Sequence, residues 1–397
     1  MNEGEKRKTI AKIKRLCDRV RSLVDSDENQ RRRRLWKSTA GLPNSFARHL
    51  PKKGLSVTPF IADLDREMWA PVLGLDIEKI YVYPLAYLEF ELSKKIFALE
   101  QFCDDNPITK DITIWLGVGF LESLLGLPQE PAKNGHEPWV GRRSILERKE
   151  DLQSLQLPDF HRSGTAPLAH KMYSEIKAII DDDFDVVFPE WNFGPFGIAL
   201  NLRGTENFAI DMIEDPDFVY DLMKFILRAK IHWSQERAQF LPEEIHSLFL
   251  CNDDVSVPMI SPRGYQEFVL PYEKKMGEFH GGLDYWHSCG KIDPIVQYIK
   301  EIPNLKMIHL SPFTDLKKSV EIIGNDHIIE IVLNPIDDVE RATPLQMEKK
   351  LSEIKSICEG LRFTVRADAF QVLTSVENDL KQIKLWIKKA GKALHTP

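Results

Sequence analysis

The chain has 397 residues, of which 43% are hydrophobic, 10% aromatic and 28% charged. This composition is typical of a globular protein with a large buried core, and it excludes a disordered or fibrous chain. The 53 basic and 60 acidic residues give a formal net charge of -7, which argues against a globally basic nucleic-acid-binding protein. We therefore expect no nucleic-acid partner.

The N-terminus and the cysteines indicate the compartment. No apolar run approaches the length of a membrane span, and the opening sequence MNEGEKRKTIAKIKR lacks the apolar stretch of a secretory signal. We expect a cytoplasmic protein with no membrane partner. The five cysteines are scattered and odd in number, which favours reduced thiols over a disulfide scaffold.

Residues 1–50 are predicted to form a helical extension. Apolar residues recur at helical spacing within residues 3–36, at Ile10, Ile13, Leu16, Val20 and Leu23. Four consecutive arginines follow at residues 31–34. We interpret this run as a solvated helix end in preference to a phosphate-binding patch.

Residues 51–397 alternate short apolar runs with longer segments of helical period, a pattern typical of α/β proteins. Eight runs have the composition of strands: residues 55–61, 111–117, 184–190, 246–251, 282–287, 305–310, 327–333 and 361–367. Eight parallel βαβ units close a (β/α)8 barrel, so we predict a single TIM barrel after the N-terminal extension. Residues 118–160 are rich in proline, glycine and charge, and we predict that they form an excursion between strands two and three.

In a (β/α)8 barrel the active site lies at the carboxyl ends of the strands. The residues at or just beyond these ends are polar: Asp63, Asp65, Glu190, Trp191, Asn192, Asn252, Asp253, Asp254, His287, Cys289, Ser311, Asn334 and Asp368. From this set and the fifth strand we expect five residues to contact the substrate: Glu190, Trp191, Asn192, Tyr285 and Asn334.

The most specific of these sequences is YWHSCG at residues 285–290. Side chains at i and i+2 of an extended segment point the same way, so the imidazole of His287 and the thiol of Cys289 can meet. A catalytic zinc ion takes about three protein ligands and keeps one open position. The alternative is a histidine and a cysteine buried side by side without metal. His309, inside an apolar run, is interpreted as a core or supporting histidine.

Asp253 and Asp254 are the predicted catalytic residues. Ser261 can cap the helix that follows them, which leaves the two acids without a structural role. Asp254 can orient a ligand, accept a proton or support a metal ligand. Ser375 can likewise cap the last helix, so that Asp368 is free to face the strand-end pocket.

Several common signatures are missing from the sequence. It contains no GxSxG elbow, no Walker loop, no GxGxxG after a strand, no HExxH and no CxxC. The common hydrolase, nucleotide-binding and Rossmann oxidoreductase interpretations are therefore disfavoured.

Four stretches of the chain resemble the uroporphyrinogen decarboxylase superfamily, namely residues 202–223, 253–276, 286–296 and 362–390. The superfamily also contains zinc-dependent methyltransferases that act with corrinoid proteins and coenzyme M. The resemblance extends from about residue 180 to residue 391, and it implies a (β/α)8 barrel.

The methyltransferase branch has a His-x-Cys-Gly motif that binds zinc, and this motif matches His287 and Cys289. The branch takes its third ligand from a cysteine near the end of the last strand, where residues 366–369 of this chain read RADA. Asp368 is therefore the expected replacement, with Glu190 and Asp254 as further candidates.

The resemblance implies a zinc-dependent methyltransferase of the corrinoid-linked demethylase type. Such an enzyme transfers a methyl group between a small methylated substrate or thiol and a corrinoid protein. The demethylases of this branch pass the methyl group to a separate corrinoid protein, so a partner protein is expected to supply the cobamide. A homodimer is one expected assembly.

Two alternatives stay open. One is a decarboxylase of a porphyrinogen or another polycarboxylate, with Arg203, Arg263 and Arg366 as candidate cations. It is disfavoured because the arginine-rich RQAGRY-like motif of the porphyrin decarboxylases is not found, and residues 36–50 do not replace it. The other is a barrel that binds a tetrapyrrole without catalysis.

Overall fold

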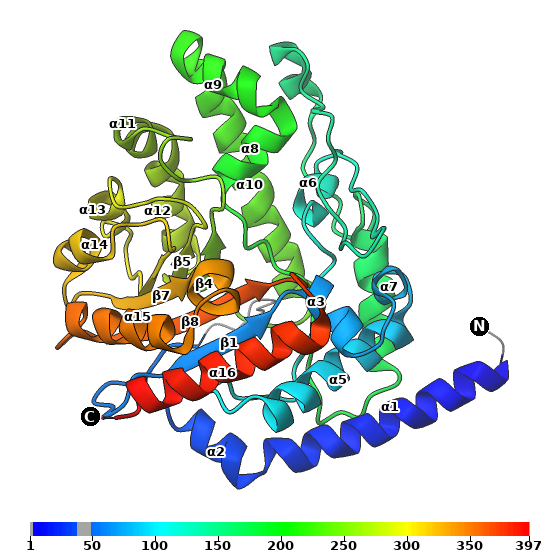
Figure 1. Ribbon diagram of the computed structural model, residues 1–397. Helices are drawn as coiled ribbons and strands as arrows, with labels where there is room; N and C mark the ends of the chain where they lie inside the picture. The colour runs from blue at the N-terminus through cyan, green and yellow to red at the C-terminus, as the bar shows by residue number, and fades with distance from the viewer. Residues whose placement is uncertain (1–2, 38–48, 397) are drawn as a thin grey trace.

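The computed structural model describes residues 3–37 and 49–396 of the chain (Figure 1). Strands form at all eight predicted positions: β1 (Phe60–Leu64), β2 (Ile112–Thr113), β3 (Val186–Val187), β4 (Leu248–Cys251), β5 (Leu283–His287), β6 (Met307–Leu310), β7 (Ile328–Leu333) and β8 (Phe363–Phe370). β1 begins later than predicted, after Pro59, which has no N–H to donate to a ladder. The Pro59 carbonyl accepts a hydrogen bond from the Val365 N–H (3.1 Å), where the pairing with β8 starts.

Six strands form one parallel sheet in the order β1-β8-β7-β6-β5-β4, and β2 and β3 form a separate parallel pair. A parallel bridge between Phe193 and Cys251 links the segment after β3 to β4. The parallel α/β class is therefore confirmed, but the ladders of the described residues do not close into one continuous eight-stranded barrel. β2 contributes only a short arc, because its chain bends away at Gly117 and Gly119, whose φ angles are 85° and 88°.

Helices connect the strands, and the last of them, α16, packs on β1 and on α15 (Figure 1). From β1 onward the helices are α3 (Arg66–Val72), α4 (Ile77–Ile80), α5 (Pro84–Gln101), α6 (Phe120–Leu124), α7 (Ala166–Lys177), α8 (Pro195–Arg203), α9 (Thr205–Glu214), α10 (Pro216–Phe240), α11 (Pro262–Gly264), α12 (Leu270–Phe279), α13 (Val296–Ile299), α14 (Leu316–Ile323), α15 (Pro344–Ile357) and α16 (Val376–Leu394). Short 3-10 or π turns add η1 (Lys149–Ser154), η2 (Tyr265–Val269) and η3 (Pro335–Glu340).

Residues 118–160 form the predicted excursion between β2 and β3. It contains α6 and η1, and two antiparallel bridges, Glu130–Trp139 and Lys133–His136, hold a hairpin-like turn between them. The excursion comes back into contact with α3 at Glu137, whose backbone N–H donates to the Glu67 side chain (3.1 Å). It therefore contributes side chains to the same face as the strand ends.

The N-terminal extension consists of α1 (Glu3–Val24) and α2 (Asp27–Arg33), and Ser26 caps α2. α1 lies along α5 (Figure 1), and its predicted apolar stripe is buried at Ile13 and Val20. The expected boundary between extension and barrel, at residue 50, is adjacent to residues 38–48, which lie outside the described part of the chain.

The interpretation of the arginine run as a solvated end is wrong for Arg32. Its side chain is 1% exposed and pairs with Asp104 (2.9 Å), and it also donates to the Phe102 carbonyl (2.6 Å). Arg31 pairs with the buried Asp105 (3.0 Å). A buried guanidinium of this kind needs a carboxylate and several carbonyls around it, and the loop after α5 supplies them. The run therefore anchors α2 to this loop.

The core fills the space between the sheets and the helices, and its largest buried side chains include Trp191, Trp233, Trp286 and Trp386. No helix in the described part of the chain is both long enough and apolar enough to cross a membrane.

Candidate active site at the strand ends

A cavity of about 240 Å³, which we call the main cavity, opens at the carboxyl ends of the strands. Side chains from β1, β4, β5, β8, α3, α5 and the excursion meet in it. Its lining residues are Asp63, Leu64, Asp65, Arg66, Trp69, Lys94, Trp115, Glu137, Phe249, Cys251, Asp253, Tyr285, His287, Cys289, Asp368 and Ala369. The cavity has the size of a small-molecule site, and it combines aromatic walls with a few charged groups.

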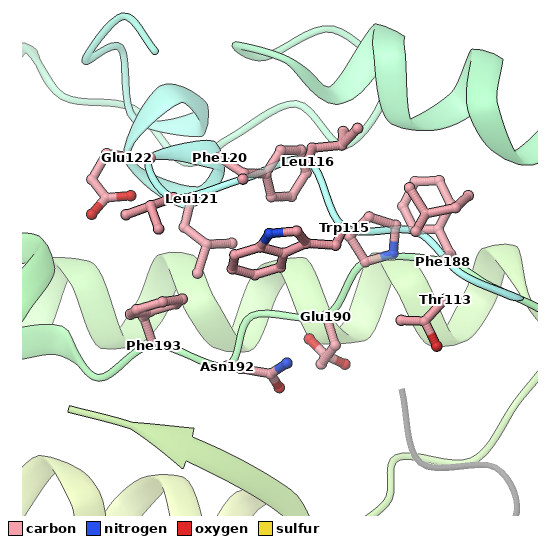
Figure 2. A pocket seen from close by; sticks show the side chains of 15 residues that line it. Thr113, Trp115, Leu116, Phe120, Leu121, Glu122, Phe188, Glu190, Asn192 and Phe193 are labelled. Carbon is pink, nitrogen blue, oxygen red and sulfur yellow. The ribbon is translucent and has the colours of Figure 1, made fainter. Parts of the chain in front are cut away.

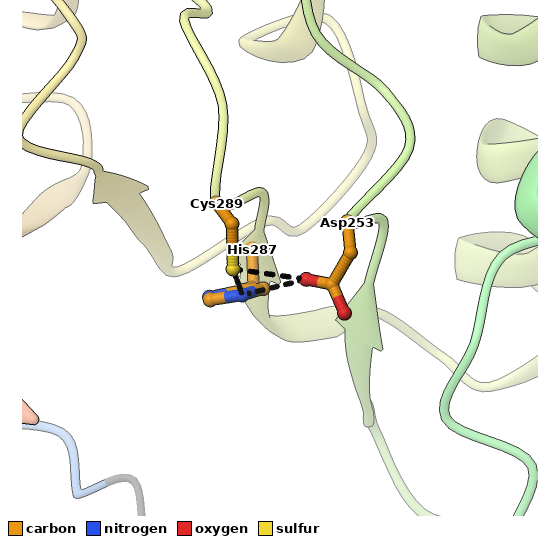
Figure 3. Close-up of side chains that lie close together, drawn as sticks. All are labelled: Asp253, His287 and Cys289. Atoms are coloured by element: carbon orange, nitrogen blue, oxygen red, sulfur yellow. Dashed lines mark hydrogen bonds and ion pairs between the residues drawn. The ribbon is translucent and has the colours of Figure 1, made fainter. Parts of the chain in front are cut away.

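Three side chains with different donor atoms converge on one wall of this cavity (Figure 3). The Nε2 atom of His287 lies 3.2 Å from the Sγ atom of Cys289 and 2.9 Å from the Oδ1 atom of Asp253. The Cys289 thiol donates to Asp253 Oδ1 over 3.3 Å. The prediction that His287 and Cys289 meet is confirmed, and Asp253 joins them.

The backbone around Gly290 explains why these residues meet. The Asn252 N–H donates to the His287 carbonyl (2.8 Å), and the Ser288 hydroxyl donates to the Val255 carbonyl (2.8 Å). The loop after β4 is thereby tied to the end of β5. A Cβ atom at Gly290 would lie 2.2 Å from the Cβ atom of Ser256, so this close approach requires glycine.

The donor set of the cluster fits a zinc ion. Tetrahedral zinc with sulfur at ~2.3 Å and nitrogen or oxygen at ~2.0–2.1 Å separates its ligand atoms by roughly 3.3–3.6 Å. The three observed separations, 2.9, 3.2 and 3.3 Å, need to lengthen by only a few tenths of an ångström. The cavity provides the open side where a fourth ligand would bind.

The pKa values of the cluster are shifted in opposite directions. Burial raises the pKa of Asp253, but its hydrogen bond to His287 and the charge of His287 outweigh this effect and lower it. Burial and the neighbouring Asp253 carboxylate raise the pKa of the Cys289 thiol. Without a metal ion the thiol is therefore held protonated, and metal binding has to release its proton.

A buried polar network supports the other ring nitrogen of His287. His287 Nδ1 lies 2.8 Å from His309 Nδ1, and the Tyr285 hydroxyl lies 2.8 Å from the same His309 atom and donates to Glu330. Glu330 in turn accepts from Arg366 Nε (2.9 Å). His309, whose pKa burial and His287 lower to about 4, is neutral at physiological pH and can accept the Nδ1–H of His287. This arrangement directs Nε2 of His287 toward Asp253 and Cys289.

Two of the predicted acids, Asp368 and Asp254, lie outside the three-residue cluster. Asp368, the expected third ligand, lines the cavity but is not part of the three-residue cluster found among the described residues. Its carboxylate lies 3.9 Å from Arg366 Nε. Asp254, an expected catalytic residue, is packed against Gly197 in the first turn of α8, where a Cβ atom would lie 2.6 Å from its Oδ2 atom. Consecutive residues at the turn after β4 thus send Asp253 and Asp254 to different sides.

Of the five predicted substrate contacts, three line one of two cavities and two line neither of them. Tyr285 lines the main cavity, whereas Glu190 and Asn192 line a neighbouring cavity of about 30 Å³ around Trp115 (Figure 2). Burial raises the pKa of Glu190, but the charges of Arg237, Lys230 and His280 lower it overall. Trp191 is fully buried and not among the residues that line either of these two cavities. The Asn334 side chain caps η3 by accepting from the Ile336 and Asp337 N–H groups, and Asn334 is not among the lining residues of the main cavity.

Sequence reasoning did not find Arg66, Trp69, Lys94, Trp115 or Glu137 as cavity residues. Trp115 lies near the carboxyl end of the predicted strand at residues 111–117, and that position was a usable signal. The others come from α3, α5 and the excursion, which reach the cavity only through tertiary packing. No local pattern marks them.

Comparison with known proteins places the chain in a family. Residues 124–362 match the sequence model described as uroporphyrinogen decarboxylase (URO-D). The chain belongs to the uroporphyrinogen decarboxylase family. It is also 26% identical, over 186 residues or 46% of its length, to the methylated-thiol–coenzyme M methyltransferase of Methanosarcina mazei, and spans about half (48%) of that relative. A methyltransferase from Methanosarcina mazei with a solved structure shares the fold, with a TM-score of 0.62, 14% identity and coverage of 85% of this chain and 94% of that one.

This member of the uroporphyrinogen decarboxylase family does not gather the predicted decarboxylase cations at its main cavity. Arg203 pairs with Asp211 (2.7 Å), Arg263 is exposed, and Arg366 is buried against Glu330. The described cations that line the cavity are Arg66 and Lys94. The segment compared with the arginine-rich motif, residues 36–50, lies largely outside the described residues.

Glu273 in α12 gives the stability of the folded protein a testable pH dependence. It accepts hydrogen bonds from Asn252 (2.7 Å), Tyr265 and Trp286 (3.1 Å), and burial raises its pKa to about 7 despite them. The folded protein therefore holds this proton more tightly than the unfolded chain, and stability is lost as the pH rises from about 4.5 to about 7. In Glu273→Gln this loss should be smaller by ~3 kcal/mol. Urea unfolding of both proteins across this range measures the difference, and parallel pH profiles would contradict it.

Proposed function

We propose that this protein is a zinc-dependent methyltransferase that moves a methyl group between a small methylated substrate or thiol and a corrinoid protein. The observation that carries the proposal is the Asp253–His287–Cys289 cluster at the cavity. The uroporphyrinogen decarboxylase family membership and the methylated-thiol–coenzyme M methyltransferase relative support it.

In this proposal each residue of the cluster has a defined task. His287 presents Nε2 because His309 accepts from its Nδ1, Cys289 supplies a thiolate, and Asp253 supplies the oxygen donor. Bound zinc would act as a Lewis acid that lowers the pKa of a substrate thiol or polarises a leaving group. We propose Asp368, the acid first expected as the third metal ligand, and Asp63 as contacts with the substrate, since both line the cavity. Tyr285 contacts His309 from β5 and donates its hydroxyl proton to Glu330.

The corrinoid group is proposed to come from a partner protein, as the resemblance to the corrinoid-linked methyltransferases implies. We also propose that the two sheets are arcs of one (β/α)8 barrel over residues 51–397, with residues 1–50 as the extension. The Phe193–Cys251 bridge between the arcs supports this.

Methylcobalamin and small thiols test the proposal directly. We expect the zinc-loaded protein to accelerate loss of the cobalt-carbon absorbance, and Cys289→Ser to lower the rate by ~100-fold or more. Cys103→Ser, which changes an exposed cysteine outside the cavity, is the matched control. Equal rates in the Cys289→Ser and Cys103→Ser proteins would rule out the proposed role of the cluster.

A further inference from the structure

The main cavity carries an excess of negative charge. Five of its described lining residues are acids and two are cations: Asp63, Asp65, Glu137, Asp253 and Asp368 against Arg66 and Lys94. Both cations pair with the same buried carboxylate, that of Glu91, each over 2.9 Å. Glu91, which does not line the cavity, therefore partly neutralises their charge. The lining acids still outnumber the lining cations when Asp253 is counted as a metal ligand.

Most of the excess acids lie away from the cluster of Asp253, His287 and Cys289. That cluster is at β4 and β5, at one edge of the six-stranded sheet, whereas Asp63 and Asp368 are on β1 and β8 at the other edge. Arg366 lies 3.9 Å from both of these acids, but its closer partner is Glu330 at 2.9 Å. The cavity thus carries carboxylates from β1 and β8 in addition to the cluster at β4 and β5.

Glu137 is held in place by two aromatic side chains, and Asp65 lines the same cavity. Glu137 accepts hydrogen bonds from the Tyr81 hydroxyl (2.6 Å) and the Trp115 indole N–H (2.9 Å). Trp69 and Trp115 both line the cavity. Burial raises the pKa of Glu137, and burial likewise raises that of Asp65, so both charges are incompletely compensated by the protein. Carboxylates together with indole rings in one cavity form an environment that attracts ammonium groups.

We propose that the substrate whose sulfur reaches the Asp253–His287–Cys289 cluster also carries a positively charged amine, which binds between Glu137, Asp65 and the indoles of Trp69 and Trp115. The substrate class is a small aminothiol or its methylated form. The placement of the sulfur at the cluster rests on the proposed function. The binding of the amine rests on the charge and the lining residues of the cavity.

Three thiols of equal chain length and different charge test the inference: 2-aminoethanethiol, 2-mercaptoethanol and 2-mercaptoethanesulfonate. Calorimetric titration of the zinc-loaded protein at low salt should give about tenfold or greater preference for the aminothiol over the sulfonate. The preference should shrink at high salt, because the charges face a solvent-accessible cavity. Equal affinities, a preference for the sulfonate or no binding of any of the three would overturn the inference.

Glu137→Gln should reduce aminothiol affinity by roughly three- to tenfold and leave 2-mercaptoethanol unchanged, because glutamine keeps the hydrogen-bond acceptor and loses only the charge. Asp65→Asn, which keeps the oxygen that accepts from the Glu67 N–H, is a second variant with the same expectation. Glu147→Gln, a largely exposed acid of the same excursion, is the control and should change nothing. An unchanged aminothiol preference in both cavity variants contradicts the inference.

Choline and isethionate, which have no thiol, separate this inference from the proposed function. Metal-free protein should bind choline more tightly than isethionate, since this contact does not need the cluster. Zinc binding without any preference for cations would refute the inference and leave the methyltransferase proposal standing. A cation preference in a protein that takes up no zinc would support the cation site and refute the zinc-dependent methyltransferase proposal.

Discussion

Asp253→Ala is expected to weaken zinc binding more severely than Asp368→Ala. Asp253 Oδ1 lies 2.9 Å from His287 Nε2 and 3.3 Å from Cys289 Sγ, so its removal leaves two ligands in the proposed site. Loss of a supporting residue typically costs about 10–100-fold in metal affinity, and loss of a direct ligand should exceed this range. We therefore expect Asp253→Ala to resemble His287→Ala and Cys289→Ala. Competition with a chromophoric chelator measures the four affinities.

The Asp254→Ala variant is the matched control for this comparison. Its carboxylate is adjacent in sequence but packs against Gly197 of α8, so its loss should leave zinc affinity nearly unchanged. If Asp368→Ala abolished zinc binding while Asp253→Ala preserved it, the third ligand would come from β8, as the resemblance to the methyltransferase branch first implied.

Glu330→Ala is expected to destabilise the fold by ~3–5 kcal/mol, because it leaves a buried charge without its partner. Glu330 and Arg366 have side-chain exposures of 2% and 1%, and their ion pair is 2.9 Å long. Glu330 also accepts from Tyr285, so the change removes two buried hydrogen bonds at once. Urea unfolding monitored by tryptophan fluorescence gives the difference in free energy.

Replacing both partners should cost much less than replacing either one. In Glu330→Leu with Arg366→Met neither member of the buried pair is left without the other, and such replacements of buried pairs are often neutral. The double variant therefore separates stability from function: it should fold, yet bind zinc more weakly, because His309 and Tyr285 lose the carboxylate that orients them. Additive losses of stability in the double variant would show that the two charges are not coupled.

The strand positions could be predicted because their apolar runs are short, rich in β-branched residues and bounded by turns. Closure of the barrel could not be predicted in the same way, since β2 and β3 pair over only two residues each before glycine and proline redirect the chain. The burial of Arg32 was also out of reach, because Asp104 lies far along the chain.

The meeting of His287 and Cys289 followed from their i, i+2 spacing, and their contact confirms it. Their role as metal ligands stays a prediction. The position of Asp368 was harder to foresee, because the β1–β8 pairing shifts register around it and Ala369 adopts a φ of 58°. A β-bulge of this kind re-aims side chains in a way that strand alternation does not predict. Glu137 reaches the cavity through the fold of the excursion, which no spacing rule describes.

Zinc-edge X-ray absorption of the purified, zinc-loaded protein tests the central claim most directly. The Asp253–His287–Cys289 site predicts one sulfur at ~2.3 Å and nitrogen or oxygen neighbours at ~2.0–2.2 Å, with the sulfur signal lost in Cys289→Ser. A spectrum with nitrogen and oxygen neighbours alone, or a sulfur signal that persists in Cys289→Ser, would contradict the proposed site.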